Sequence, residues 1–227
     1  MIFDPWYFII ILPGFLLSLW AQSKVKGNFE KYSKVRNSAG LTGAQTSRRI
    51  LDDEGLSSIP IEQVAGALTD HYDPRTKVLR LSQPVYGQDS VAAMAVAAHE
   101  AGHAIQQKVG YSPLKFRSAI VPLANIGSQL GFLLLFLGII IGISGLSWAG
   151  VALFALSTIF TLVTLPVEFD ASRRAKAELT KLGLTDRTDA EAVDKVLDAA
   201  AWTYVAAFLT SALSLLYYIR LAQGSRR

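Results

Sequence analysis

The sequence predicts a mainly α-helical membrane protein, with about four transmembrane helices and a small cytoplasmic α/β domain that contains a β-hairpin. Hydrophobic residues make up 51% of the 227 residues and charged residues only 18%, whereas soluble domains are about 25% charged. The apolar residues gather in four long runs, and many Lys and Arg residues lie beside these runs. This pattern argues against a soluble globular protein, a disordered chain and a basic nucleic-acid binder.

Each apolar run approaches or exceeds the ~20 residues that a helix needs to cross a bilayer. The four runs are Phe3–Trp20, Ile120–Ile143, Leu146–Val167 and Ala199–Leu221. The first could be a cleaved signal peptide, but it has no Lys or Arg before its apolar part and no small-residue cleavage site after Trp20. We therefore expect an uncleaved anchor. The second and third runs could be buried helices of a soluble protein, but the short uncharged linker between them favours a membrane hairpin.

The basic residues predict how the chain crosses the membrane. They follow the first run, precede the second and follow the third, whereas the linker at 143–148 has none: Lys24, Lys26, Lys31, Lys34, Arg36, Lys115, Arg117, Arg173, Arg174, Lys176 and Lys181. The positive-inside rule then places these regions in the cytoplasm. The C-terminal tail, with Arg220, Arg226 and Arg227, would lie outside and would break the rule. The fourth run could therefore lie along the interface or re-enter the membrane.

Five segments follow from this topology. The first transmembrane helix takes residues 1–20, a cytoplasmic α/β region takes 21–117, and transmembrane helices two and three take 118–167. Cytoplasmic helices occupy 168–198, and the fourth transmembrane helix with its basic tail occupies 199–227.

Local signals predict the elements of the α/β region. Residues 42–54 read as a helix with Thr42 as its N-cap and Gly55 as its stop. A strand is expected at 59–64, and strands at 68–72 and 78–82 flank an Asp-Pro turn, which indicates a β-hairpin. Ser90 caps a helix that runs to about Val109. Helical pattern continues through 167–182, stops at Gly183, and begins again near Thr188 to run into the fourth apolar run.

The motif that points to chemistry is His-Glu-x-x-His at residues 99–103. On a helix His99 and His103 share one face, so both imidazoles can reach one metal ion, while Glu100 projects about 100° away. The chain has no cysteine, so Cys-ligated metal sites and thiolate nucleophiles are excluded, and Zn²⁺ is the favoured ion. Zinc would lower the pKa of its water to ~7, and Glu100 could take the remaining proton.

The alternative is that two histidines meet by chance on an amphipathic helix. The helix caps and the small residues around the motif argue against chance. Gly102 in mid-helix costs ~1 kcal/mol relative to alanine, so another segment is expected to approach the helix closely there.

A catalytic zinc takes three protein ligands and leaves one position open. The third ligand is His71, the one remaining histidine, or a carboxylate. Glu168 is the best candidate because it ends a long uncharged run, where a charge is costly without a partner. Alternatively, Glu168 and Asp170 only mark the membrane boundary and pair with Arg173 or Arg174.

Other residues have supporting roles in this hypothesis. Asp170 lies on a different helix face from Glu168, so we expect it to orient an imidazole or to pair with a basic residue. His71 is either an ordinary packed histidine or a substrate contact, and Tyr72 and Arg80 have the same two interpretations. An edge strand of the hairpin could hold an extended substrate backbone by strand addition.

Three blocks of the sequence together resemble a known family. They are SVAAMAVAAHEAGHAIQ at 90–106, LTDHYDPRTKVLRLS at 68–82 and PVEFDASRRA at 166–175. They are similar to the YugP-type bacterial membrane zinc metallopeptidases over essentially the whole chain, and more distantly to the gluzincin membrane proteases. The resemblance implies a zincin-like domain with one Zn²⁺ per chain, His99 and His103 as ligands, Glu100 as the catalytic base and Glu168 as the third ligand. The supporting aspartate of gluzincins falls here on Ser172, so Asp170 could substitute for it.

We therefore expect an integral-membrane zinc endopeptidase of the bacterial inner membrane, with its active site on the cytoplasmic side. Its partners would be a protein or peptide substrate and the lipid bilayer, without nucleic acid; a homo-oligomer or a membrane adaptor is compatible with the pattern. The alternative is a non-catalytic membrane scaffold or sensor with a structural zinc site, but a structural site has no need of Glu100. A transporter is disfavoured, because the second and third runs carry almost no charge to line an ion path.

Overall fold

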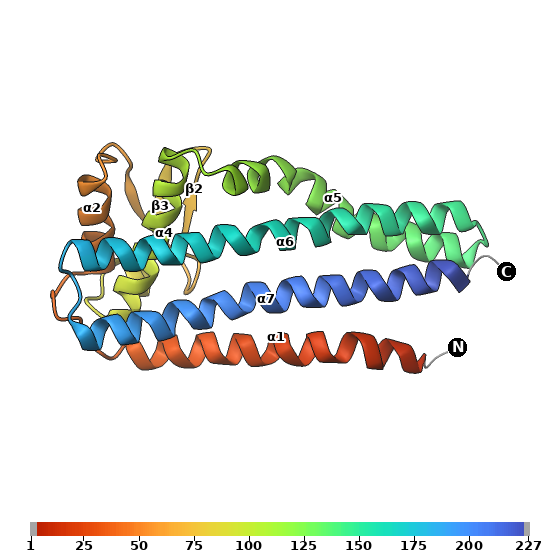
Figure 1. Cartoon of the computed structure of the whole chain (residues 1–227), viewed down its shortest axis with the longest axis horizontal. Helices are drawn as coiled ribbons and strands as arrows, with labels where there is room; N and C mark the ends of the chain where they lie inside the picture. The colour runs from red at the N-terminus through yellow and green to blue at the C-terminus, as the bar shows by residue number, and fades with distance from the viewer. Residues whose placement is uncertain (1–3, 225–227) are drawn as a thin grey trace. The chain divides into compact units, whose positions relative to one another are not determined.

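The computed structural model describes residues 4–224 and is mainly helical, with one small three-stranded sheet (Figure 1). Phe3, Arg226 and Arg227, which belong to the expected first span and basic tail, lie outside the described residues. The elements in order are α1 (Pro5–Tyr32), α2 (Gly43–Asp53), β1 (Ile61–Val64), β2 (His71–Asp73), β3 (Val78–Ser82), α3 (Gln83–Tyr86), α4 (Val91–Lys108), α5 (Ser112–Ile140), α6 (Ser144–Lys181) and α7 (Arg187–Gly224).

The chain divides into two compact units. One comprises Met1–Gln22, Lys115–Pro166 and Trp202–Arg227, and the other comprises Ser23–Leu114 and Val167–Ala201. The first is the apolar unit and contains the greater part of each of the four predicted spans. The second, the polar unit, contains the sheet, α2, α3, α4 and the C-terminal part of α6.

Four helices of the described chain, α1, α5, α6 and α7, are long and apolar enough to cross a membrane. Each extends beyond its predicted run: α1 continues to Tyr32, α5 begins at Ser112, α6 continues to Lys181 and α7 begins at Arg187. The fourth run lies in one unbroken helix, so it forms no re-entrant loop. Pro113 lies in the first turn of α5, where proline is tolerated.

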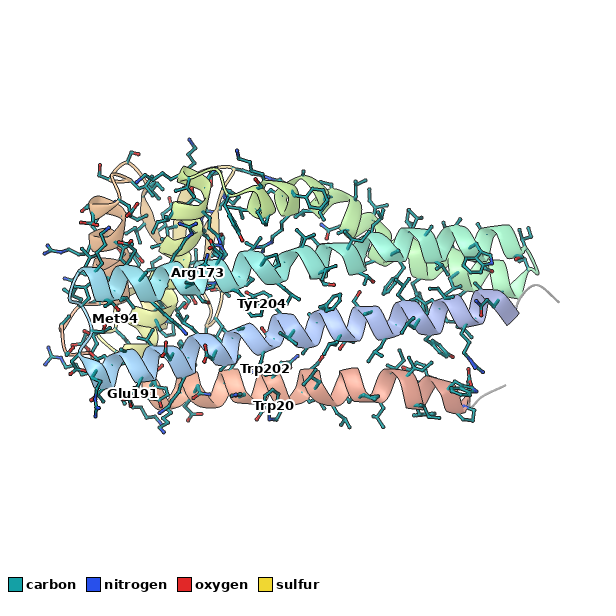
Figure 2. All side chains as sticks on the ribbon, viewed as in Figure 1. Trp20, Met94, Arg173, Glu191, Trp202 and Tyr204 are labelled. Atoms are coloured by element: carbon teal, nitrogen blue, oxygen red, sulfur yellow. The ribbon has the colours of Figure 1, made fainter. Side chains whose placement is uncertain are left out.

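Within the apolar unit, small and polar residues bring the helices close together. A Cβ on Gly127 of α5 would lie 2.3 Å from the carbonyl oxygen of Leu153 of α6, so only glycine permits this approach. Thr210 of α7 donates a 3.0 Å hydrogen bond to the Gly14 carbonyl of α1. Trp20 and Trp202 meet edge to face at 5.4 Å between ring centroids (Figure 2).

The polar unit is built around α4. Nearly all of α4 is buried, because its many alanines let neighbouring elements approach closely. The sheet has the order β1-β3-β2, with β1 parallel and β2 antiparallel to β3. Ser47 of α2 donates a 2.9 Å hydrogen bond to the Ala97 carbonyl, which ties α2 to α4.

The predicted caps are confirmed. Thr42 and Gln45 form a capping box at the start of α2, and the Ser90 hydroxyl accepts from the Ala93 amide at the start of α4. Gly55, Gly110 and Gly183 follow α2, α4 and α6 with positive φ angles, the conformation that ends helices most readily at glycine.

The hairpin is confirmed with shorter strands. The structure begins β2 at His71 rather than at 68, because the Asp70 side chain takes the place of a ladder partner and accepts the Ser82 amide at 2.7 Å. The preceding Leu68 has a φ of 59°, which is incompatible with a strand. The first strand begins at Ile61, after Pro60. The short helix α3 is an element that the sequence analysis missed.

Candidate metal centre

His99 and His103 lie on one face of α4, and Glu168 of α6 faces both of them. The two imidazole rings are nearly perpendicular, with 4.8 Å between their centroids. The Oε2 atom of Glu168 lies 3.1 Å from Nε2 of His99 and 3.5 Å from Nε2 of His103. All three side chains are buried. Residues that are distant in sequence thus direct three ligand-type atoms to one point.

These distances suit a tetrahedral zinc. Nitrogen and oxygen ligands lie about 2.0–2.2 Å from Zn²⁺, which places two ligand atoms of a tetrahedron roughly 3.3–3.6 Å apart. The distances of 3.1 and 3.5 Å from Glu168 to the two rings agree with this spacing to a few tenths of an ångström. The donor set of two imidazoles and one carboxylate is also one that Zn²⁺ uses in catalytic sites.

Gly102 allows α6 to come close enough for Glu168 to reach the histidines. A Cβ on Gly102 would lie 2.6 Å from the carbonyl oxygen of Ala171, which is too short for any side chain. The close approach that a mid-helix glycine predicted is therefore present, and the approaching segment is the turn that follows Glu168.

The outer ring nitrogens of the two histidines have different partners. Nδ1 of His99 lies 3.1 Å from the Ser172 hydroxyl, and Nδ1 of His103 lies 3.0 Å from Oε1 of Gln106. Gln106 is fully buried, and its Nε2 donates to the Val167 carbonyl at 2.7 Å and to Asp170 at 2.9 Å. Because the amide nitrogen is committed to two acceptors, the amide oxygen faces His103, and Nδ1 of His103 is the donor.

Asp170 is linked to His103 through Gln106. Its buried carboxylate accepts hydrogen bonds from Arg174 at 2.6 Å and from Arg173. The expected pairing with basic residues is present, and Figure 2 labels Arg173 on α6.

The ring of His103 has a raised pKa in this arrangement. Burial by itself lowers the pKa, but the interaction with Glu168 and the negative charge of Glu100 outweigh burial. The site therefore attracts positive charge.

Glu100 is buried beside the two histidines and is held by the hairpin. Its Oε2 accepts a 2.9 Å hydrogen bond from the backbone amide of Tyr72. The Tyr72 hydroxyl donates to Gln107, whose own amide donates to the Pro74 carbonyl at 2.9 Å. Burial, together with the charge of Asp73, raises the pKa of Tyr72 to about 12, so this phenol stays protonated at neutral pH.

The structure places His71 outside this group of residues. Its ring is exposed, with Nδ1 2.9 Å from the Thr69 carbonyl. Side chains alternate along a strand, so when Tyr72 turns toward α4, His71 turns away. Arg80, the cross-strand partner of His71, pairs instead with Glu62 and Asp73.

Gln106 is a polar residue of the site that the sequence analysis missed, and Gln107, which contacts the hairpin, was missed as well. The signal available for Gln106 was its position: it follows His103 by about one helical turn, on the helix face that carries both histidines. A second group of acidic residues, Asp53, Glu54 and Glu178, also lies close together, but Lys181 pairs with all three and Lys108 pairs with Glu54.

Comparison with known proteins identifies the family. The family model described as "putative neutral zinc metallopeptidase" matches residues 7–223. The chain belongs to this family. It is also similar to the "Putative membrane protease YugP" of Bacillus subtilis (strain 168), with 49% identity over 210 residues that cover 92% of this chain and 93% of the relative. No solved structure matches the chain significantly.

The neutral zinc metallopeptidase match includes all three sequence blocks that carry the resemblance. In the structure these blocks lie on α4, on the hairpin and on α6. The first and third blocks supply His99, His103 and Glu168, and the hairpin block contacts Glu100 through the Tyr72 amide. Membership in the family implies zinc and a protein substrate, and the four apolar helices together with the relative's name indicate a multi-pass membrane protein.

Proposed function

We propose that the protein is a zinc endopeptidase of the bacterial inner membrane that cleaves membrane or membrane-associated proteins. In this proposal His99, His103 and Glu168 hold one Zn²⁺, and Glu100 is the general base. The observation that carries the proposal is the convergence of Nε2 of His99, Nε2 of His103 and Oε2 of Glu168 on one buried point.

The tautomer of His103 that Gln106 favours supports a cation at this point. Because Nδ1 of His103 donates to Gln106, a neutral ring carries a lone pair on Nε2. That lone pair faces a carboxylate oxygen 3.5 Å away. A positive charge between these two atoms removes their repulsion. A proton on Nε2 can supply it in the metal-free site, and the donor set favours Zn²⁺ as the ion that would replace that proton. When bound, the ion would polarise the scissile carbonyl and lower the pKa of a coordinated water to about 7.

Glu100 is placed to move protons without binding the metal. The Tyr72 amide holds Oε2 of Glu100, which leaves Oε1 for the attacking water. In the proposed reaction Glu100 takes a proton from that water and then passes it to the leaving amine nitrogen of the cleaved peptide. Burial of the carboxylate beside the hairpin keeps it oriented between these two steps.

The group of ligand atoms supports a catalytic rather than a structural zinc site. Structural zinc sites are usually closed by four protein ligands, whereas catalytic sites have three and leave one position open. Among residues 4–224, the group around the two histidines has three members. In this arrangement the two histidines come from α4 and the third proposed ligand, Glu168, comes from α6.

The distribution of charge supports an active site on the cytoplasmic side. The apolar linker between α5 and α6 carries no Lys or Arg, whereas the segments at 21–117 and 168–198 are rich in them. We propose that these two segments form the zincin-like cytoplasmic domain and that the runs at 1–20, 118–167 and 199–227 anchor it in the bilayer.

Zinc content and proteolysis of purified variants test this function. Wild-type protein should contain about one zinc per chain, because one group of possible ligands combines two imidazoles with a carboxylate. It should also cleave a model substrate such as casein. His99→Ala and His103→Ala should each lose the metal. Glu100→Gln should keep the metal and lose proteolysis by roughly 10²–10⁴-fold, because the base acts on water and not on the ion. Full zinc in the double histidine variant, or undiminished cleavage by Glu100→Gln, would contradict the proposal.

A further inference from the structure

We propose that Gln106 is a positioning residue that keeps His103 in the tautomer able to bind zinc. This inference rests on the proposed zinc site. His103 can share a metal ion with Glu168 only if its Nε2 carries a lone pair and no hydrogen. Gln106 touches neither substrate nor metal in this role and acts through His103 alone.

The geometry around Gln106 fixes the direction of its amide. Its Nε2 donates to the Val167 carbonyl and to Asp170, so its Oε1 is the atom presented to Nδ1 of His103. An oxygen at 3.0 Å accepts a proton and cannot donate one, so it selects the ring form with hydrogen on Nδ1. Nε2 then keeps its lone pair.

When the metal is absent, Glu168 favours the other tautomer of His103. A ring with hydrogen on Nε2 could donate to the Glu168 carboxylate, which lies 3.5 Å away, and this form cannot bind zinc through Nε2. A buried carboxylate is a strong acceptor, so the wrong tautomer would be stabilised in the free enzyme. The hydrogen bond to Gln106 counters this preference.

The partner of Nδ1 of His99 does not fix the tautomer of that ring, so the proposed role of Gln106 applies to His103 alone. Its Nδ1 faces the hydroxyl of Ser172, a group that can donate or accept and therefore selects neither tautomer. Gln106 is held more firmly, because Asp170 is itself buried and bound by Arg173 and Arg174. The hydrogen-bonded series Asp170–Gln106–His103 thus fixes which ring nitrogen of His103 carries the hydrogen.

The tautomer can be observed directly because the chain has only three histidines. Apo protein with ¹⁵N-labelled histidine is studied by NMR at alkaline pH, where imidazoles are neutral, and zinc affinity is measured by competition with a chelator. Gln106→Met removes the hydrogen bonds at similar volume. Gln107→Met is the matched control, because it makes the same change at the next position and also loses two side-chain hydrogen bonds.

In wild type, and in Gln107→Met, hydrogen should be on Nδ1 of His103. In Gln106→Met it should shift toward Nε2, and zinc should bind about 10–100-fold more weakly. If Gln106→Met does not fold, Asp170→Asn tests the same series of hydrogen bonds. This substitution would let the Gln106 amide turn, so it should shift the His103 tautomer in the same direction.

Two results would overturn the role of Gln106: an unchanged tautomer with weaker zinc binding, which would mean a merely structural role, or an unchanged tautomer with unchanged affinity. The NMR arm uses apo protein, so it remains informative about Gln106 even if the wild type binds no zinc. A wild type without zinc binding would instead overturn the proposed function.

Discussion

At the scale of single residues, Glu168 is a carboxylate in an unusual place. It is 2% exposed, and it follows a run of about twenty uncharged residues in the same helix. A buried carboxylate is costly unless it is paired. The two imidazoles supply that pairing, and in the proposed enzyme the zinc ion completes it.

The ligand assignment predicts a clear order of effects on zinc affinity. Glu168→Ala should weaken zinc binding far more than the ~10–100-fold typical of residues that only orient a ligand, whereas Asp170→Ala should fall within that range. His71→Ala should have no effect, because the His71 ring is exposed and lies away from the group. Zinc titration of the purified variants measures all three. The assignment is wrong if Asp170→Ala or His71→Ala empties the site while Glu168→Ala leaves it full.

At the scale of elements, the crossing of α4 and α6 determines whether the three ligand atoms can meet. Gly102 lies at the closest point, against the backbone of Ala171. The other element that contributes is the hairpin, which holds Glu100 through the Tyr72 amide. A small displacement of α6 or of the hairpin should therefore change the positions of the side chains in the site.

Gly102→Ala should destabilise the protein by about 1–3 kcal/mol and weaken zinc binding, because the added methyl group must push α6 away from α4. Gly27→Ala is the matched control: it is also a helical glycine, but a Cβ there meets nothing within 4 Å. The control should be neutral or more stable, since alanine is favoured over glycine in helices by ~1 kcal/mol. Thermal unfolding in detergent compares the two, and equal stability would contradict the proposed crossing.

The hairpin turn should lose stability in acid through Asp73. A hydrogen bond from the Thr76 hydroxyl, followed by one from the Arg75 amide, lowers the pKa of Asp73 to about 2. Because the folded pKa is below the unfolded value of ~3.9, the charged form stabilises the fold above about pH 4, and this contribution disappears as the pH falls toward 2.

Asp73→Asn should therefore unfold more easily than wild type at neutral pH, by about 1 kcal/mol. The difference between the two proteins should shrink as the pH falls from about 4 to 2. Thermal midpoints measured across this range give the answer. A difference that stays constant down to the lowest pH would show that Asp73 acts in some other way.

At the scale of the whole molecule, four helices of the described chain are long and apolar enough to span a membrane. Apart from Arg220 near the end of the fourth run, the basic residues lie outside the apolar runs. The arrangement predicts which loops face the cytoplasm. Cysteine labelling is well suited to this question because the chain has no cysteine of its own.

Gln88→Cys should be protected from a membrane-impermeant thiol reagent in intact cells, whereas Ile143→Cys should be labelled. Gln88 is exposed on the polar unit, and Ile143 is 53% exposed in the uncharged linker between α5 and α6. Both positions should react after the membrane is opened. Labelling of position 88 but not 143 in intact cells would reverse the topology.

Much of this protein can be predicted from its sequence, because the signals involved are local. Apolar length predicts the four long helices, caps at Thr42 and Ser90 predict where α2 and α4 begin, and the spacing of His99 and His103 predicts a shared face. Glu168 could be nominated because a charge that ends an apolar run is conspicuous in a single segment.

Only the tertiary structure decided how these pieces meet. It brought Glu168 to the histidines, turned His71 away, and placed the Tyr72 amide on Glu100 and Gln106 on His103. Such contacts join different elements or depend on the partners that another element supplies. They follow from the register of a strand and from the closeness of two helices at Gly102, and neither quantity is contained in the periodicity of any one segment.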